Sequence, residues 1–120
     1  MDIIKDEFNY DNLRLLLSKI IDDGFVYPEQ EFVNWCNRGW VKNMDIDVED
    51  KFLVKTLQVA ADIDCQWDLY LANKYTLPEL RQLDHTLVKL PKDYYKDWLS
   101  ELIGEKIAKM SAEQFQTFWT

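Results

Sequence analysis

The residues best suited to acid–base or metal chemistry are few and widely spaced. His85 is the single histidine, and the two cysteines, Cys36 and Cys65, lie far from it and from each other along the chain. A zinc site of nitrogen and sulfur ligands needs three or four such side chains together, and a histidine-activated nucleophile needs a positioned serine or cysteine. We therefore expect no metal site and no nucleophile, with His85 at the surface or boundary and the cysteines as buried thiols, although a disulfide between them stays open.

A run of acids at Asp45, Asp47, Glu49 and Asp50 could in principle belong to a calcium-binding loop. A calcium loop of the helix–loop–helix kind needs glycine at its sixth position and glutamate at its twelfth. Counting from Asp45, those positions hold Asp50 and Thr56, so the loop pattern fails. The acids are better explained as the capped start of a helix.

Catalytic patterns of other kinds are also missing from the sequence. Carboxylate pairs occur by chance in a chain this acidic, so they do not indicate general acid–base catalysis. The 3 glycines are isolated and form no phosphate-binding loop. We expect a protein that is not an enzyme and that uses no cofactor.

The charge distribution is the clearest functional feature. Net charge is −8, and residues 1–70 carry 15 acidic against 7 basic side chains, whereas residues 71–120 carry 7 of each. An acidic chain is repelled by phosphate backbones and attracted to basic surfaces, which argues against direct nucleic-acid binding. The plainer interpretation is that the acidity keeps the protein soluble.

Large rings lie beside these acids and predict a surface for a basic protein partner. Trp40 precedes the Asp45–Asp50 run, and Phe25 and Tyr27 lie among acids between the first two predicted helices. Rings supply desolvated anchors and charge speeds encounter, although each ring could instead fold inward. The predicted partner-binding residues are Asp22, Asp23, Glu29, Glu31, Trp40, Asp45, Asp47, Glu49 and Asp50.

The elements that must position these residues are predicted to be helices of a single domain, residues 1–120. The chain is 48% apolar with only 3 Gly and 3 Pro, which favours long elements and few turns. We predict helices over 11–22 (ended by Gly24), 28–38 (ended by Gly39) and 47–62 (capped by Asp47). The segment 39–46 is expected to be a connector with a brief strand as an option. The segment 62–75 is expected to be helical, either continuing the third helix or restarting near Asp64, rather than a strand.

The firmest prediction is an antiparallel helix hairpin over residues 76–104. Thr76 and Glu79 form a capping box, and Leu80, Leu83, Leu87 and Leu90 follow at helical spacing before Pro91 separates the two arms. The second arm carries an apolar face that includes Tyr94, Tyr95 and Trp98, and a final helix is expected from Ser111. The fold class is therefore all-α, a compact irregular bundle of about six helices around this central hairpin.

Part of the hairpin resembles a known family. Tyr75-Thr76, Glu79-Leu80 and Leu90-Pro91 with the amphipathic helix after it resemble the middle helical region of ArdA-type antirestriction proteins. The resemblance is confined to residues 75–103, the rest of the chain does not show that family's N-terminal pattern, and we claim no membership.

Two functions from different classes follow. The first is a small inhibitor, of the phage or mobile-element anti-defence type or the nuclease-toxin immunity type, that acts as a nucleic-acid mimic on a basic surface such as that of a nuclease. The alternative is a helical oligomerisation or scaffold subunit, a homodimer included, that binds another chain through the aromatic face of Tyr94, Tyr95, Trp98 and Phe118. The absence of an N-terminal basic region with an apolar run, and of a membrane-spanning stretch, predicts a cytoplasmic protein.

Overall fold

The computed structural model describes residues 3–44 and 49–107, and within these the chain is all-helical. Five α-helices and one short 3-10 helix occur in the described part: α1 (Tyr10–Ile21), α2 (Glu29–Asn43), α3 (Lys51–Lys74), α4 (Leu77–Gln82), η1 (His85–Leu87) and α5 (Lys92–Ile107). The all-α class is thereby confirmed. The helix expected from Ser111, and Asp45 and Asp47 of the acidic run, lie outside the described residues.

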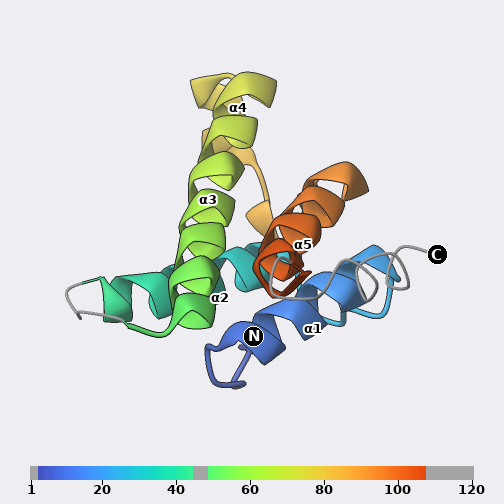
Figure 1. The fold of residues 1–120 in the computed structure, drawn as a ribbon. Helices are drawn as coiled ribbons and strands as arrows, with labels where there is room; N and C mark the ends of the chain where they lie inside the picture. Colours follow the sequence, from blue (N-terminus) through green and yellow to red (C-terminus); the bar gives the residue numbers. More distant parts are fainter. Residues whose placement is uncertain (1–2, 45–48, 108–120) are drawn as a thin grey trace.

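The long helix α3 is the element on which the others assemble (Figure 1). It packs against both α2 and α5, and α1 packs mainly on α5. The 3-10 helix η1 packs against α2. The core between these helices draws on every long helix and consists mainly of Leu13, Leu17, Phe32, Trp35, Cys36, Val59, Ile63, Trp67, Tyr95, Trp98 and Leu102.

Side-chain caps fix where three of the helices begin. The Asn9 side chain accepts a hydrogen bond from the Asn12 amide (2.8 Å) at the start of α1. The Asp50 carboxylate accepts from the Phe52 amide (2.9 Å) at the start of α3. Such caps satisfy amides that have no partner within the helix, each contributing about 1 kcal/mol. The predicted capping box of Thr76 and Glu79 is confirmed at α4.

Helix α1 ends at Ile21, one residue before the predicted end at residue 22 and three residues before Gly24, which was expected to stop it. Asp23 adopts a left-handed backbone (φ 61°), and the Gly24 amide returns to the Lys19 carbonyl (2.8 Å). Aspartate tolerates this conformation better than most residues because its short polar side chain bonds locally. The left-handed position is therefore held by Asp23 and not by Gly24.

The prediction that α2 ends at Gly39 is wrong, because α2 runs on to Asn43. Residues 39–43 are helical, so neither the connector nor the strand option holds there. Gly39 does not end the helix; it allows the Phe8 ring to approach the helix backbone closely. A Cβ at Gly39 would lie 2.1 Å from the nearest ring carbon of Phe8, so only glycine allows that ring to sit against the helix.

The third helix extends to Lys74, which confirms helix over 62–74, while its cap is Asp50 and not Asp47. Ile63, Trp67 and Leu71 are buried at four-residue steps, whereas Cys65 and Leu69 are exposed. Helical spacing thus decides which of the alternating apolar residues face the core. The expectation that Cys65 is buried is wrong: Cys36 is buried, Cys65 is exposed, and both thiols are free.

The antiparallel helix hairpin over 76–104 is not confirmed. Helix α4 stops at Gln82, and Asp84 then caps η1, accepting from the Thr86 amide (3.0 Å) and the Thr86 hydroxyl (2.6 Å). These local bonds compete with the helical ones, and the residue before a proline disfavours helix, which leaves Leu90 extended. Leu87, expected on the buried stripe, is 75% exposed. Only the second arm, α5, forms as a long helix, and it continues past Gly104.

Candidate partner-binding groove

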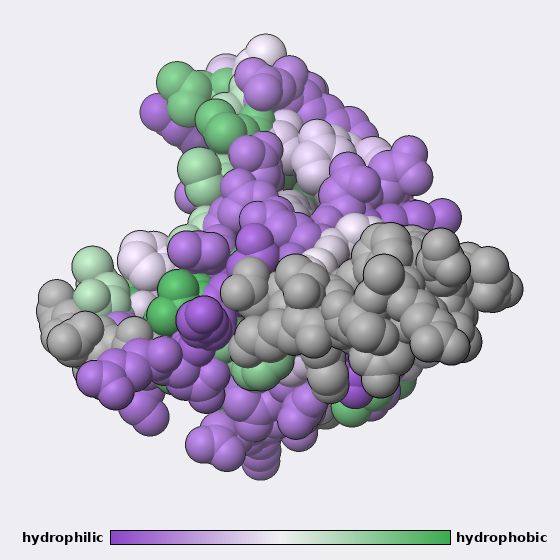
Figure 2. All heavy atoms as spheres, viewed as in Figure 1, coloured by the Kyte–Doolittle hydropathy of each residue, from purple (hydrophilic) through white to green (hydrophobic). Residues whose placement is uncertain are grey.

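A hollow among the described residues opens where three elements meet. It lies between the segment that leads into α1, the last turns of α2 and the start of α3, and its volume is about 670 Å³. Its apolar lining is Phe8, Tyr10, Phe52 and Leu53, and its charged lining is Glu7, Asp11, Lys42 and Asp50. We call this feature the acidic groove. Figure 2 shows apolar and hydrophilic atoms side by side over the end of α2 and the start of α3.

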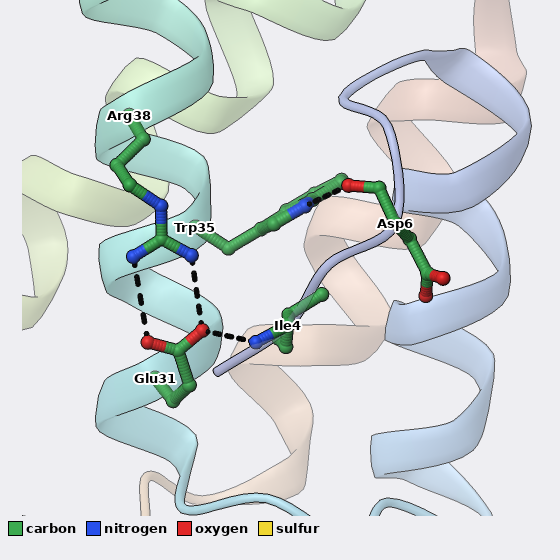
Figure 3. A network of polar contacts seen from close by, with 5 residues as sticks. All are labelled: Ile4, Asp6, Glu31, Trp35 and Arg38. Carbon is green, nitrogen blue, oxygen red and sulfur yellow. Dashed lines mark hydrogen bonds and ion pairs between the residues drawn. The ribbon is translucent and has the colours of Figure 1, made fainter. Parts of the chain in front are cut away.

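The wall formed by residues 7 and 8 exists because α2 holds the N-terminal segment in place (Figure 3). The Ile4 amide donates to Glu31 Oε2 (2.8 Å), and the Trp35 indole N–H donates to the Asp6 carbonyl (2.9 Å). Arg38 pairs with the same Glu31 carboxylate (3.0 Å). Leaving a buried donor without its acceptor costs about 1–3 kcal/mol, so these contacts fix the segment firmly.

Ring packing continues the wall toward the groove. Phe8 contacts the Trp35 ring at a centroid distance of 5.0 Å and lies against Gly39. Across the groove, Tyr10 contacts Phe52 edge-on at 5.4 Å. Burial raises the pKa of the Tyr10 phenol, and the neighbouring Asp11 carboxylate adds to that rise. The apolar side of the groove is therefore contributed by both α1 and α3.

No ion pair between described residues neutralises the carboxylates of the groove. The ion pairs between described residues are Arg38–Glu31, Lys55–Glu101 and Lys92–Asp23, and none of them includes Glu7, Asp11 or Asp50. These three side chains are exposed and face one exposed cation, Lys42, in the lining. Like charges gathered around a hollow with low-dielectric walls focus the electric field toward a cation.

Only part of the predicted partner-binding set gathers at this groove. Asp50 lines it, and Glu49 is the exposed neighbour of Asp50. Asp22 and Asp23 lie at the other end of α1, a helix about 18 Å long. There Asp23 pairs with Lys92, whose hydrogen bond and charge hold the pKa of Asp23 below its usual value.

Three other residues of the predicted set serve the fold. Glu31 is 5% exposed and binds the N-terminal segment. Glu29 accepts from the Leu90 amide (2.9 Å) and from the Tyr95 hydroxyl. The half-buried Trp40 donates its indole N–H to Asp64 (3.1 Å). Their carboxylates and ring nitrogen are committed to internal contacts, so we do not carry these three forward as partner contacts.

Glu7, Phe8, Tyr10 and Asp11 are groove residues that were not in the predicted set. The sequence does place Asp11 in the first turn of a helix capped by Asn9. It contains nothing that brings residues 7–11 next to residues 42–53, because that proximity arises from long-range contacts to Glu31 and Trp35. The alternation of two acids with two rings, Glu-Phe-Asn-Tyr-Asp, is the one local feature that could have drawn attention.

The aromatic face proposed for an alternative interface is turned inward in the described part. Tyr95 is 1% and Trp98 is 4% exposed. The Trp98 indole N–H donates to Asp62 (2.9 Å), and Tyr94 contacts Tyr70 edge-on. Phe118 lies outside the described residues. Tyr95 and Trp98 therefore contribute to packing against α2 and α3.

Comparisons with known proteins returned no match of any kind. Searches against protein families, curated proteins and solved structures each found none. Over the described residues, no set of three or more His, Cys, Asp or Glu side chains is placed to hold a metal ion. No helix in that part of the chain has both the length and the apolar character needed to cross a membrane.

Proposed function

We propose that this protein is a small acidic, non-catalytic binding protein that inhibits a nucleic-acid enzyme by occupying its basic surface. A phage or mobile-element anti-defence protein and an immunity protein against a nuclease toxin both fit this description. The observation that carries the proposal is a partly apolar groove surrounded by three carboxylates that form no ion pair with any other described residue.

The distribution of acids supports a role beyond solubility. Four acids of the first half, Glu29, Glu31, Asp62 and Asp64, act as internal acceptors, so the fold uses part of the excess negative charge. The other acids of the first half that the structure describes are exposed, and they include the acids around the groove. A surface of this kind attracts the binding site of a nucleic-acid enzyme and suppresses binding to nucleic acid itself.

The test uses the intact protein as bait in an extract of its native host, followed by competition on the captured partner. We expect a protein that binds DNA or RNA, and we expect this chain to displace the nucleic acid from it. Added salt should weaken capture steeply, because the attraction depends on exposed charge. A partner that holds nucleic acid and this chain at the same time contradicts the proposal.

A further inference from the structure

We infer that the acidic groove is the docking site for a basic segment of the partner in which a large apolar side chain is flanked by arginine or lysine. The inference deepens the function proposed above and rests on it. The apolar residue would pack against the lining formed by Phe8, Tyr10, Phe52 and Leu53. The flanking cations would reach Glu7, Asp11 and Asp50. One short segment of that kind satisfies both kinds of lining at once.

The size of the groove fits a few side chains and not a flat protein face. Pockets that enclose small ligands have volumes of about 300–1,000 Å³, and the groove is about 670 Å³. Interfaces usually depend on a few anchors that fill such a hollow, with arginine and aromatic residues prominent among them. A segment that projects from the partner is the simplest occupant of this shape.

The electrostatics select a cation in preference to an anion or a second copy of this chain. Among the described residues, the charged lining holds three carboxylates and one ammonium, Lys42. A second copy has a net charge of −8, so its approach would bring like charges together. Nucleic acid is excluded for the same reason. Arginine suits the groove well because its guanidinium binds carboxylates through paired hydrogen bonds and stacks on rings.

Contacts within the fold hold the groove open before any partner binds. Glu31 and Trp35 fix the segment before α1, and Gly39 gives the Phe8 ring its place. Asn9 and Asp50 cap the two helices whose first turns line the hollow. Because these groups are already in position, little ordering cost remains for binding.

The experiment titrates the full-length, isotope-labelled protein with three synthetic peptides and follows backbone amide shifts by NMR. The first peptide, Gly-Arg-Trp-Leu-Lys-Gly, carries both features. The second, Gly-Glu-Trp-Leu-Glu-Gly, keeps the apolar pair without the cations. The third, Gly-Arg-Ser-Ser-Lys-Gly, keeps the cations without the apolar pair. We expect shifts at the amides of Phe8, Asp11, Phe52 and Leu53 with the first peptide and at most weak shifts with the other two.

Variants that preserve the fold then test how much the groove carboxylates contribute to peptide binding. The groove-neutral variant, Glu7→Gln with Asp11→Asn and Asp50→Asn, keeps a capping side chain at position 50 because asparagine caps as well as aspartate. Its matched control, Asp68→Asn with Asp93→Asn and Asp97→Asn, changes net charge equally at exposed positions on α3 and α5. We expect the groove-neutral variant to bind the first peptide about tenfold more weakly and the control to stay within about twofold.

A change of opposite sign separates charge from misfolding. Lys42→Gln removes the one cation of the lining, so it should tighten binding by about twofold to threefold, a gain that partial unfolding does not produce. No shifts at the groove amides at millimolar peptide, or equal loss in the two triple variants, would overturn the inference. So would groove shifts on concentrating the protein alone, since the occupant would then be a second copy.

Failure of this inference and failure of the proposed function give different results. If the captured partner still loses its nucleic acid to the groove-neutral variant, inhibition stands and the groove is not its docking site. If the peptide binds as expected but no captured partner loses nucleic acid, the groove accepts a basic segment and the inhibitory function is wrong.

Discussion

At the scale of single residues, the acids inside the fold accept hydrogen bonds from other parts of the chain. Glu31 receives the Ile4 amide and the Arg38 guanidinium, and Asp62 and Asp64 receive indole N–H groups. The two most strongly shifted groups are neutral ones. Burial raises the pKa of the Cys36 thiol, and burial with the Glu29 hydrogen bond raises the pKa of the Tyr95 phenol far above its usual range.

Stability should therefore fall at alkaline pH. The ordinary pKa values are 9.0 for the thiol and 10.0 for the phenol, and both are higher in the folded protein. Above about pH 9 the unfolded chain binds fewer protons than the folded one, so rising pH favours unfolding. Urea unfolding from pH 7 to about pH 10.5 measures this slope. Cys36→Ala combined with Tyr95→Phe should flatten it; an unchanged slope contradicts the assignment.

The two thiols should differ sharply in reactivity. Cys65 is exposed on α3 and Cys36 is buried, and the thiolate is the reactive form. A thiol reagent at pH 8 should modify one cysteine per molecule quickly and the second only after urea is added. Mass spectrometry identifies the site, and rapid labelling of Cys36 in the native protein would show that the core opens more readily than described here.

Gly39 gives a prediction whose sign depends on its neighbour. Gly39→Ala should destabilise the protein by about 1–3 kcal/mol, because the new methyl group collides with the Phe8 ring. In a Phe8→Ala background the collision is gone, and the same change should stabilise the protein by up to about 1 kcal/mol through better helix propensity. Urea unfolding of the four proteins measures both values, and the same sign in both backgrounds would contradict the contact.

At the scale of elements, local patterns predicted the start of α4 and the continuation of the third helix through residues 62–74 correctly, but they placed the cap of the third helix at Asp47 instead of Asp50. The Thr76–Glu79 box caps α4 as expected, since its interactions span only three residues. Helix ends were predicted less well. Gly39 lies within α2 because of a tertiary contact, and the 83–90 stretch is not helical because Asp84 captures local backbone and side-chain donors and Leu90 is bonded to Glu29. The spacing of apolar residues alone does not reveal that these hydrogen bonds compete with helix formation.

The helical register of α3 can be tested at two residues that alternation alone would treat as equivalent. Trp67→Ala removes a buried ring and should cost about 3–5 kcal/mol of unfolding free energy. Leu69→Ala removes a side chain that is 48% exposed and should change stability by less than about 0.5 kcal/mol. Urea midpoints of the two variants measure the difference, and equal losses would contradict this register.

At the scale of the whole molecule, the sequence predicted the class and the acidic first half but not where the charge gathers. The split between 15 and 7 acids is read directly from composition. The groove is not, because it depends on the N-terminal segment folding back on α2 and on α3 beginning beside it. For the same reason the predicted partner set included Glu29 and Glu31. Their inward positions result from tertiary contacts that the sequence does not show.

The overall charge also sets how the protein should behave toward any partner. If recognition depends on the acidic groove, position must matter as well as net charge. The groove-neutral variant and its matched control on α3 and α5 have the same net charge and differ in where the carboxylates are lost. Comparing them separates a specific docking surface from general attraction between an acidic protein and a basic one.

The most direct test of the central claim is the dissociation constant of the captured partner for the wild type, the groove-neutral variant and the matched control. We predict a dissociation constant about tenfold higher for the groove-neutral variant, and a control within about twofold of the wild type. Equal weakening in the two triple variants, or no weakening in either, would contradict binding through the acidic groove.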